Sequence, residues 1–508
     1  MSNQVGLNYY KKGAIISYVT IIINIISSLL YTPWMLSKIG ESNYGLYTLA
    51  TTFINIFLVD FGFSSAVSRF ISKYRAEGNQ EKIDNFLGMI YKLYGIITGI
   101  VFVVLIVLYF FVDKIYVSLT TEELVRFKVV YLIAGSYTIL SFPFSSTLNG
   151  IMTSCEKYYQ MKVCELLHKV LTVALIIVAL SGGLGLYALV TVNALTGVIN
   201  IVLKISILRK TTKIKVNFKF FDKTILKEIF SFSIWVTVSA ICSRLIFNIT
   251  PSVLAIMVGS SAITMFNLAS TIEGYTYTFS SAVDGMFMPK IARLVKEDPS
   301  CKNVEYLLNK VGRIQFFIII LIVMGFCVVG KEFVSLWLGS DYIEVYYCAI
   351  LLIIPAPFYL SQQIAKNTVV VLGKVKYQAF VNIAKSAVNI ILVVIFSKFW
   401  GVLGAATSIC ISYLVRNVGL NIIYQKVLGL NMLKFHYNCY VKTLPGVILT
   451  AICGVVFNRL LPNYSWITLF IKILLICVCY VAFVWLLSFN KGERDLVKGI
   501  ILKNHKRG

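Results

Sequence analysis

The chain has 508 residues, of which 58% are hydrophobic and only 14% charged, and its mean hydropathy is +0.82. Soluble domains carry about 25% charged residues, so this composition excludes an ordinary globular enzyme. The formal net charge is +25 at pH 7. Because the cations concentrate in short segments between apolar runs, nucleic-acid binding is not needed to explain that charge.

Apolar runs of about 20 residues recur along the chain, which is the length a helix needs to cross a hydrocarbon core about 30 Å thick. Helices satisfy their own backbone polar groups inside lipid, and the alternating pattern of an outer-membrane barrel is missing. We therefore predict an all-α polytopic membrane protein with about fourteen transmembrane helices. Their expected ranges are 13–33, 44–66, 88–112, 129–151, 163–181, 184–208, 229–258, 262–288, 313–338, 345–372, 376–397, 401–424, 440–460 and 466–489.

The first run, 13–33, follows Lys11 and Lys12 and lacks a small-residue cleavage site, so we expect a retained helix and not a signal peptide. The eleven cysteines are scattered, without metal-ligand spacing or an extracytoplasmic pair that suggests a disulfide. We expect them to act as small apolar fillers, and we expect no metal or cofactor.

Charge asymmetry predicts the topology. With both termini in the cytoplasm, inside segments hold 32 of the 47 Lys and Arg residues, outside segments hold 7, and 8 lie within spans. Including the acidic residues, the net charge divides as +21 inside, 0 outside and +4 within the membrane. This distribution follows the positive-inside rule and predicts a multi-pass inner-membrane protein with both termini in the cytoplasm. Four tryptophans fall at predicted outer helix ends, where interfacial rings prefer to lie: Trp34, Trp337, Trp400 and Trp466.

The two halves of the chain share landmarks at a nearly constant offset. Ser64-Ser65-Ala66-Val67 recurs 216 positions later as Ser280-Ser281-Ala282-Val283, and Lys169 recurs as Lys385. Further matches at offsets of 214 to 218 pair Thr32-Pro33 with Thr250-Pro251, Pro143-Phe144 with Pro357-Phe358, Tyr159-Gln160 with Tyr377-Gln378, and Gly185 with Gly401. The offset maps helices 1–6 onto helices 7–12 in the same orientation. Parallel repeats of this kind are a known transporter architecture, with the substrate site between the repeats.

We therefore predict four regions: an N-lobe at 1–208, a basic cytoplasmic linker at 209–228, a C-lobe at 229–425, and two further helices with a basic cytoplasmic tail at 426–508. Matching prolines lie within spans of both lobes, at Pro33 and Pro251 and at Pro143 and Pro357. Each removes a backbone hydrogen bond, so it marks either a bent helix or a hinge for lobe movement.

The opening helix pair carries Pro33-Trp34 and the turn Gly40-Glu41-Ser42-Asn43-Tyr44-Gly45-Leu46-Tyr47, followed by the loop Ser68-Arg69-Phe70-Ile71-Ser72-Lys73-Tyr74. With two parallel lobes, a basic linker and two extra helices, the chain resembles the polysaccharide transporters (Wzx-type oligosaccharide flippases) of the multidrug/oligosaccharidyl-lipid/polysaccharide (MOP) flippase superfamily. The resemblance covers essentially the whole chain.

This resemblance implies a flippase that moves undecaprenyl-diphosphate-linked oligosaccharide units to the outer leaflet by alternating access. It also implies contacts with membrane lipids, with polysaccharide polymerase and with assembly proteins. Outward movement of a diphosphate gains about 2.3 kcal/mol per charge per 100 mV. The sequence carries no Walker motif, so we expect the membrane potential or an ion gradient to drive transport.

Charged residues within the predicted spans are the candidate site, because an ionisable group at a helix centre costs about 2.5–3.5 kcal/mol unless it faces a cavity or a partner. The predicted spans contain eight cationic and four acidic residues, and this excess of positive charge predicts a cavity that binds an anion. Lys92, Lys204 and Lys472 lie near span ends and are expected to snorkel. The proposed diphosphate-binding residues are Arg244, Lys169, Lys385, Lys366 and Arg416.

Two acids, Asp60 and Glu273, are candidates for carrying a coupling proton or sodium ion. Polar side chains suited to sugar hydroxyls, or equally to bonds between helices, are Asn24, Asn55, Asn248, Asn267, Asn389, Gln362 and Gln363. An ion-coupled multidrug exporter of the same superfamily is an alternative, although it should expose acids to a cationic drug. A membrane glycosyltransferase or polymerase is another alternative, although the longest predicted outside loop, 113–128, is short for a catalytic site.

Overall fold

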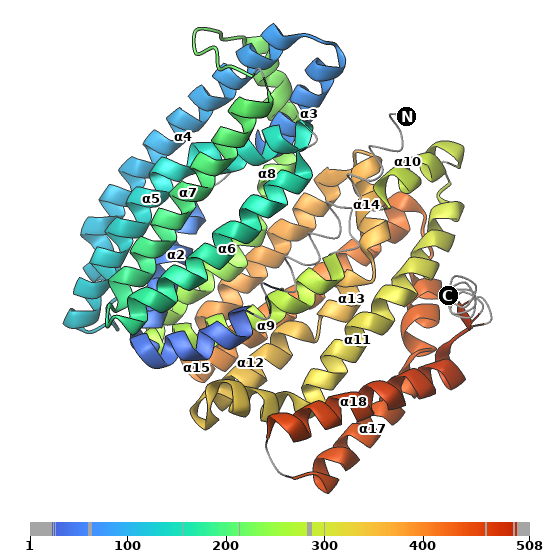
Figure 1. Ribbon diagram of the computed structural model, residues 1–508. Helices are drawn as coiled ribbons and strands as arrows, with labels where there is room; N and C mark the ends of the chain where they lie inside the picture. The colour runs from blue at the N-terminus through green and yellow to red at the C-terminus, as the bar shows by residue number, and fades with distance from the viewer. Residues whose placement is uncertain are drawn as a thin grey trace, which may run out of the picture. The chain divides into compact units, whose positions relative to one another are not determined.

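Figure 1 shows a computed structural model of the chain, which describes residues 23, 25, 27–58, 63–155, 157–212, 214–281, 287–298, 300–462, 465–490, 493 and 494. Within these ranges the secondary structure is helical and no strand occurs. Nine of the helical segments described are long and apolar enough to cross a membrane. The predicted class, an all-α polytopic membrane protein, is therefore confirmed, and the count of fourteen crossings stays a prediction.

The chain divides into two compact units. Unit 1 comprises Met1–Asn267 and Ser386–Ala405, and unit 2 comprises Leu268–Lys385 and Ala406–Gly508. These units are defined by packing contacts and do not test the predicted division into two repeats, which stays a prediction. The helices of unit 1 are residues 27–39, α2 (Glu41–Phe57), α3 (Phe63–Ala76), α4 (Gln80–Ile115), α5 (Thr121–Ser154), α6 (Tyr158–Ser181), α7 (Leu186–Thr211) and α8 (Lys223–Met257).

Helix α9 (Ser260–Ser281) begins in unit 1 and continues into unit 2, and the long α15 (Val375–Leu428) contributes to both. The other helices of unit 2 are α10 (Met288–Glu297), α11 (Lys302–Leu338), α12 (Ile343–Ile353), α13 (Ala356–Leu360), α14 (Gln363–Val371), α16 (Met432–His436), α17 (Leu444–Leu460) and α18 (Trp466–Phe483). Unit 2 also contains a 3₁₀ turn, η1 (Ser340–Tyr342), and two π-helical turns, η2 (Tyr437–Val441) and η3 (Val484–Ser488).

Several helices begin at side-chain caps that the sequence supplies. Asn79 caps α4 and Asp222 caps α8, and Thr120 and Glu123 form a reciprocal capping box at the start of α5. Helix α4 has 36 residues, so at 1.5 Å per residue it is about 54 Å long and must extend beyond a hydrocarbon core. Within unit 1, α5 packs against α2, α3, α4 and α7. In unit 2, α17 and α18 pack against each other and against α11 (Figure 1).

Two predicted helices are broken in the structure. The range 44–66 was expected to be continuous, but α2 ends at Phe57, Leu58 has non-helical dihedrals (φ −85°, ψ 72°) and a separate α3 begins at Phe63. The range 345–372 is divided into α12, α13 and α14. The cause of the first break in that range is Pro355, which has no N–H to donate and stands where α12 gives way to α13.

Glycine sets the bend in the longest helix. Gly401 interrupts α15 with φ 55° and ψ −128°, a conformation that an L-residue rarely adopts, so 376–397 and 401–424 are two helices meeting at a kink, as predicted. A Cβ on Gly404 would lie 2.1 Å from the Phe396 carbonyl oxygen, so this sharp turn also requires glycine at 404.

Candidate functional site

A group of polar and aromatic side chains in the interior of unit 2 brings together three of the predicted site residues. Glu273 on α9 is buried, and the hydroxyl of Tyr359 on α13 donates to its Oε1 at 3.4 Å. The Tyr359 ring stacks on the ring of Tyr413 from α15, with centroids 5.1 Å apart and an interplanar angle of 27°. The tyrosine pair therefore links the carboxylate of α9 to α15, the helix that carries both Lys385 and Arg416.

Each tyrosine ring holds one cation on its face. The Lys385 ammonium nitrogen lies 4.9 Å from the Tyr413 ring centroid, and the Arg416 guanidinium carbon lies 5.5 Å from the Tyr359 centroid. Arg416 also donates from Nε to Oδ1 of Asn382 at 3.2 Å. Cation–π contacts strengthen as water is excluded, and Lys385 is only 3% exposed. Two cations and one carboxylate thus converge, which gives the group a formal excess of one positive charge when Glu273 is ionised.

The tyrosine pair was missed from sequence, because 30 tyrosines gave no reason to single out two of them. A polar stripe continues along α15 at helical spacing from Tyr413 to Asn417 and Asn421. The buried Oδ1 atoms of both asparagines accept no hydrogen bond from the protein groups described, and Asn421 Nδ2 lies 3.2 Å from His436 Nε2. The interior of unit 2 is therefore polar well beyond the three charged residues.

The remaining predicted site residues lie elsewhere or outside the description. Lys169 on α6 of unit 1 is half-buried and donates to Ser28 Oγ at 3.4 Å. Lys366 is half-buried on α14 of unit 2. Arg244 lies on α8, but its side chain is outside the described part of the structure, as is the whole of Asp60. The predicted meeting of Lys169, Arg244 and Lys385 at one cavity stays a prediction.

Two lysines expected to snorkel are instead buried, so those expectations were wrong. Lys472 is 1% exposed and its Nζ lies 2.5 Å from Oε2 of Glu332 on α11. Lys204 is 5% exposed and donates to Asn149 Oδ1 at 2.9 Å. A buried charge requires such a partner. The Lys472–Glu332 pair reduces the predicted excess of positive charge by one.

Lys92 is half-buried and donates to the Phe220 carbonyl at 3.2 Å. Among the polar candidates, Asn267 donates to Tyr44 Oη at 2.7 Å and Gln362 donates to Tyr440 Oη at 3.2 Å, so both bond neighbouring helices. Asn389 is fully buried, and neither of its amide atoms has a partner among the protein groups described.

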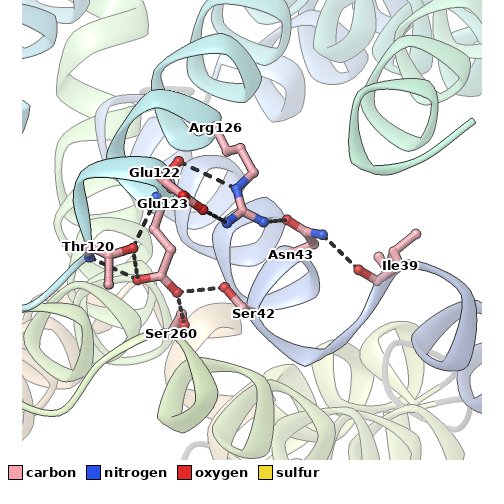
Figure 2. Close-up of polar contacts among 8 residues, drawn as sticks. All are labelled: Ile39, Ser42, Asn43, Thr120, Glu122, Glu123, Arg126 and Ser260. Carbon is pink, nitrogen blue, oxygen red and sulfur yellow. Dashed lines mark hydrogen bonds and ion pairs between the residues drawn. The ribbon is translucent and has the colours of Figure 1, made fainter.

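Unit 1 contains a second constellation, at helix ends for which the sequence predicts an outside location, and Figure 2 shows its contacts. Ser42, at the start of α2, and Ser260, at the start of α9, each donate to Oε1 of Glu123 at 2.6 Å. Oε2 of the same carboxylate accepts from the Thr120 backbone N–H at 3.0 Å. One glutamate therefore joins three helix ends. Sequence reasoning missed it, although the Thr120/Glu123 capping box was a readable signal.

Residues of the Gly40–Tyr47 turn account for much of this packing. Asn43 accepts from Arg126 Nη1 at 3.0 Å and donates to the Ile39 carbonyl at 2.7 Å (Figure 2). Thr264 of α9 donates to the Glu41 carbonyl at 2.8 Å, and a Cβ on Gly45 would lie 2.3 Å from the Ser260 carbonyl oxygen. The turn that suggested the family is therefore the surface on which α2 meets α9.

Comparisons with known proteins agree with this architecture. Residues 10–282 match the family model described as "Polysaccharide biosynthesis protein". The capsular polysaccharide biosynthesis protein CapF of Staphylococcus aureus is 28% identical over 211 residues, which are 40% of this chain and 50% of that protein. An uncharacterized membrane protein of Methanocaldococcus jannaschii is 28% identical over 204 residues, covering 39% and 46% of the two chains. The alignments thus span about half the length of these relatives.

Solved structures show the same fold. The lipid II flippase MurJ in an inward closed conformation superposes with a TM-score of 0.73 and 17% identity, covering 96% of this chain and 99% of that one. A multidrug resistance MATE family transporter of the MOP superfamily, in an inward-facing conformation, superposes with a TM-score of 0.63 and 16% identity over 82% and 98% of the two chains. The family model covers more than half of the chain, and the protein therefore belongs to the polysaccharide biosynthesis protein family, with the fold of the MOP superfamily.

Proposed function

We propose that the protein is a flippase that moves undecaprenyl-diphosphate-linked oligosaccharide repeat units from the inner to the outer leaflet of the bacterial cytoplasmic membrane, for capsule, O-antigen or exopolysaccharide assembly. The family supports a role in polysaccharide biosynthesis, and the fold is that of transporters. The observation that carries the choice of an anionic cargo is the placement of Lys385 and Arg416 on the Tyr413 and Tyr359 rings, with Glu273 in contact with Tyr359.

In this proposal Lys385 and Arg416 bind the diphosphate of the cargo. Arginine can hold two phosphate oxygens at once, whereas lysine acts as a point charge. The tyrosine faces stabilise both cations without neutralising them. Lys169, Lys366 and Arg244 are further proposed contributors. Glu273 or Asp60 would carry a coupling ion, and the membrane potential would favour outward movement of the diphosphate.

The Glu123 constellation is the proposed outer gate. Alternating access requires that contacts closing one side of the protein break when that side opens. Ser42 and Ser260 belong to the two predicted repeats and share one carboxylate oxygen, so separating the repeats at the outer surface must break at least one of these hydrogen bonds.

Reconstituted protein provides the test. The vesicles would contain a fluorescent undecaprenyl-diphosphate oligosaccharide, and a quencher added outside would remove the fluorescence of the molecules in the outer leaflet. The change in quenched fluorescence over time measures transbilayer movement, with and without an imposed membrane potential. Lys385→Gln should slow movement about tenfold, the effect of losing about 1.4 kcal/mol of substrate stabilisation. Lys398→Gln, an exposed lysine on the same helix, is the matched control. Equal rates for the two variants would exclude the proposed role of Lys385, and efflux of a cationic dye without lipid movement would favour the multidrug exporter.

A further inference from the structure

A cavity of about 540 Å³ in unit 2 is lined by the first turns of α11, by η2 and Lys442, and by η3 with residues that follow it. Its volume falls within the 300–1,000 Å³ range typical of ligand sites. Two of its walls are π-helical turns: η2 contributes Asn438, and η3 contributes Leu487 and Ser488. π-helical turns are rare and occur often at functional sites. The positive-inside topology places this end of the unit at the cytoplasmic surface.

Arg313 holds the two walls together. Arg313 is 5% exposed, and its guanidinium donates to the Asn438 carbonyl of η2 and, at 2.8 Å, to the Ser488 carbonyl of η3. It also forms two hydrogen bonds with the Glu493 carboxylate, at 2.6 Å and 3.0 Å. One buried side chain thus binds both π-helical turns and the segment that follows α18. The walls of the cavity are therefore held in place by specific hydrogen bonds of a buried side chain.

The rim of the cavity carries uncompensated positive charge. Arg313 and Glu493 neutralise each other, which leaves Lys310 and Lys442 as the charged lining residues. Both lysines are exposed, and within the described residues neither forms an ion pair. Lys442 lies over the Tyr437 ring, with its ammonium nitrogen 5.2 Å from the centroid, which leaves its charge available. The lining therefore has a formal charge of +2.

Apolar residues lie directly beside these cations. Leu487 lines the cavity and is 51% exposed, and its neighbour Leu486 on the same turn is 66% exposed. Tyr306 and Phe489 complete this apolar part of the lining. A site for a soluble anion would not need an exposed apolar border, whereas the junction of a headgroup and an acyl chain presents both chemistries together.

We propose that this cavity binds the phosphate group of a membrane lipid at the cytoplasmic surface, with Lys310 and Lys442 contacting the phosphate and Leu487 contacting the first part of the acyl chain. The lipid could be an anionic phospholipid of the inner leaflet or the lipid-linked diphosphate cargo, and the two share the chemistry that the site recognises. The site is separate from the Lys385 group, so the proposal depends on the predicted topology and not on the proposed transport.

A binding assay on the full chain in a mild neutral detergent tests this directly. Fluorescent phosphatidylglycerol would be titrated with the protein, and unlabelled phosphatidylglycerol, phosphatidylcholine, undecaprenyl diphosphate and glycerol 3-phosphate would compete. Lys310→Gln/Lys442→Gln should weaken binding about 25-fold, since each lysine near a lipid surface contributes about a fivefold effect. Lys302→Gln/Lys426→Gln is the matched control, because both lysines are exposed in unit 2 and lie outside the cavity lining.

The proposal is supported if only Lys310→Gln/Lys442→Gln loses lipid affinity, and if phosphatidylglycerol or undecaprenyl diphosphate competes more strongly than phosphatidylcholine. The stronger of these two competitors identifies the source of the phosphate. Equal losses in both double variants would show only diffuse attraction and overturn it. Competition by glycerol 3-phosphate as strong as that by the lipids would also overturn it. Failure of transport with intact lipid binding would count against the proposed function alone.

Discussion

Ser42 and Ser260 donate hydrogen bonds to the same atom, Oε1 of Glu123, and both distances are 2.6 Å. The two serines are 218 positions apart, the same offset that separates Thr32-Pro33 from Thr250-Pro251. Each serine comes two or fewer residues after a glycine with positive φ, Gly40 or Gly259. Equivalent turns of the two predicted repeats thus meet at one carboxylate, in register with the predicted duplication.

Removal of the Glu123 charge should loosen this junction. Glu123→Gln keeps the size of the side chain, but both serine hydrogen bonds then go to a neutral amide in place of a carboxylate. We expect the free energy of unfolding to fall by about 1–2 kcal/mol, less than for a fully buried carboxylate because Glu123 is partly exposed to water. Thermal unfolding in detergent measures this loss. Glu122→Gln is the control, because that side chain is 89% exposed and its 3.5 Å ion pair with Arg126 lies at the surface. An unchanged unfolding midpoint in Glu123→Gln would show that the junction contributes nothing to stability.

The close approach of α2 to α9 gives a second prediction. Gly45→Ala places a methyl group 2.3 Å from the Ser260 carbonyl oxygen, so the backbones must separate and stability should fall by about 1–3 kcal/mol. Gly95→Ala within α4 meets no atom within 4 Å and should be neutral or stabilising by up to about 1 kcal/mol, because alanine favours helix. Denaturation of the two variants side by side provides the measurement. Similar midpoints would mean that the contact relaxes freely.

The buried Lys472–Glu332 pair gives a third prediction. Glu332→Gln leaves the Lys472 ammonium in a site that is 1% exposed, and removing one partner of a buried pair typically costs about 3–5 kcal/mol. Glu332→Gln/Lys472→Met removes the charge as well and should recover much of the loss. Unfolding midpoints and yield of folded protein report both effects. A double variant less stable than Glu332→Gln would contradict the explanation.

Glu273 is the described acid that we propose for ion coupling, and its contact with Tyr359 suggests a paired experiment. Glu273→Gln should abolish the dependence of lipid movement on pH or on sodium, because the amide cannot take up either ion by charge. Tyr359→Phe keeps the ring beneath Arg416 and removes only the hydroxyl that donates at 3.4 Å, so it should shift that dependence without abolishing movement. Transport by Glu273→Gln with the original pH and sodium dependence would remove Glu273 from this role.

Much of the fold could be predicted from the sequence, because the length and hydropathy of each span are local properties. The kink at Gly401 and the division near Pro355 reflect residues whose backbone chemistry is plain in the sequence, although only the first was placed correctly. The end of α2 at Phe57 was not predicted, since hydropathy continues unbroken through Leu58. Lys472 was wrongly expected to snorkel, because its distance from the end of its own span does not reveal that Glu332 of α11 lies opposite it.

The sequence alone determined the membrane class, the approximate spans, the family and the individual charged residues Glu273, Lys385 and Arg416. Only the tertiary structure decided that the Tyr359–Tyr413 pair joins these three charges, that Glu123 joins three helix ends, and that Arg313 closes two π-helical turns around a cationic cavity. The physical reason is that spans form from interactions within each segment, whereas a site depends on which faces of distant helices meet. That choice is made by close packing and by the need to pair each buried polar group.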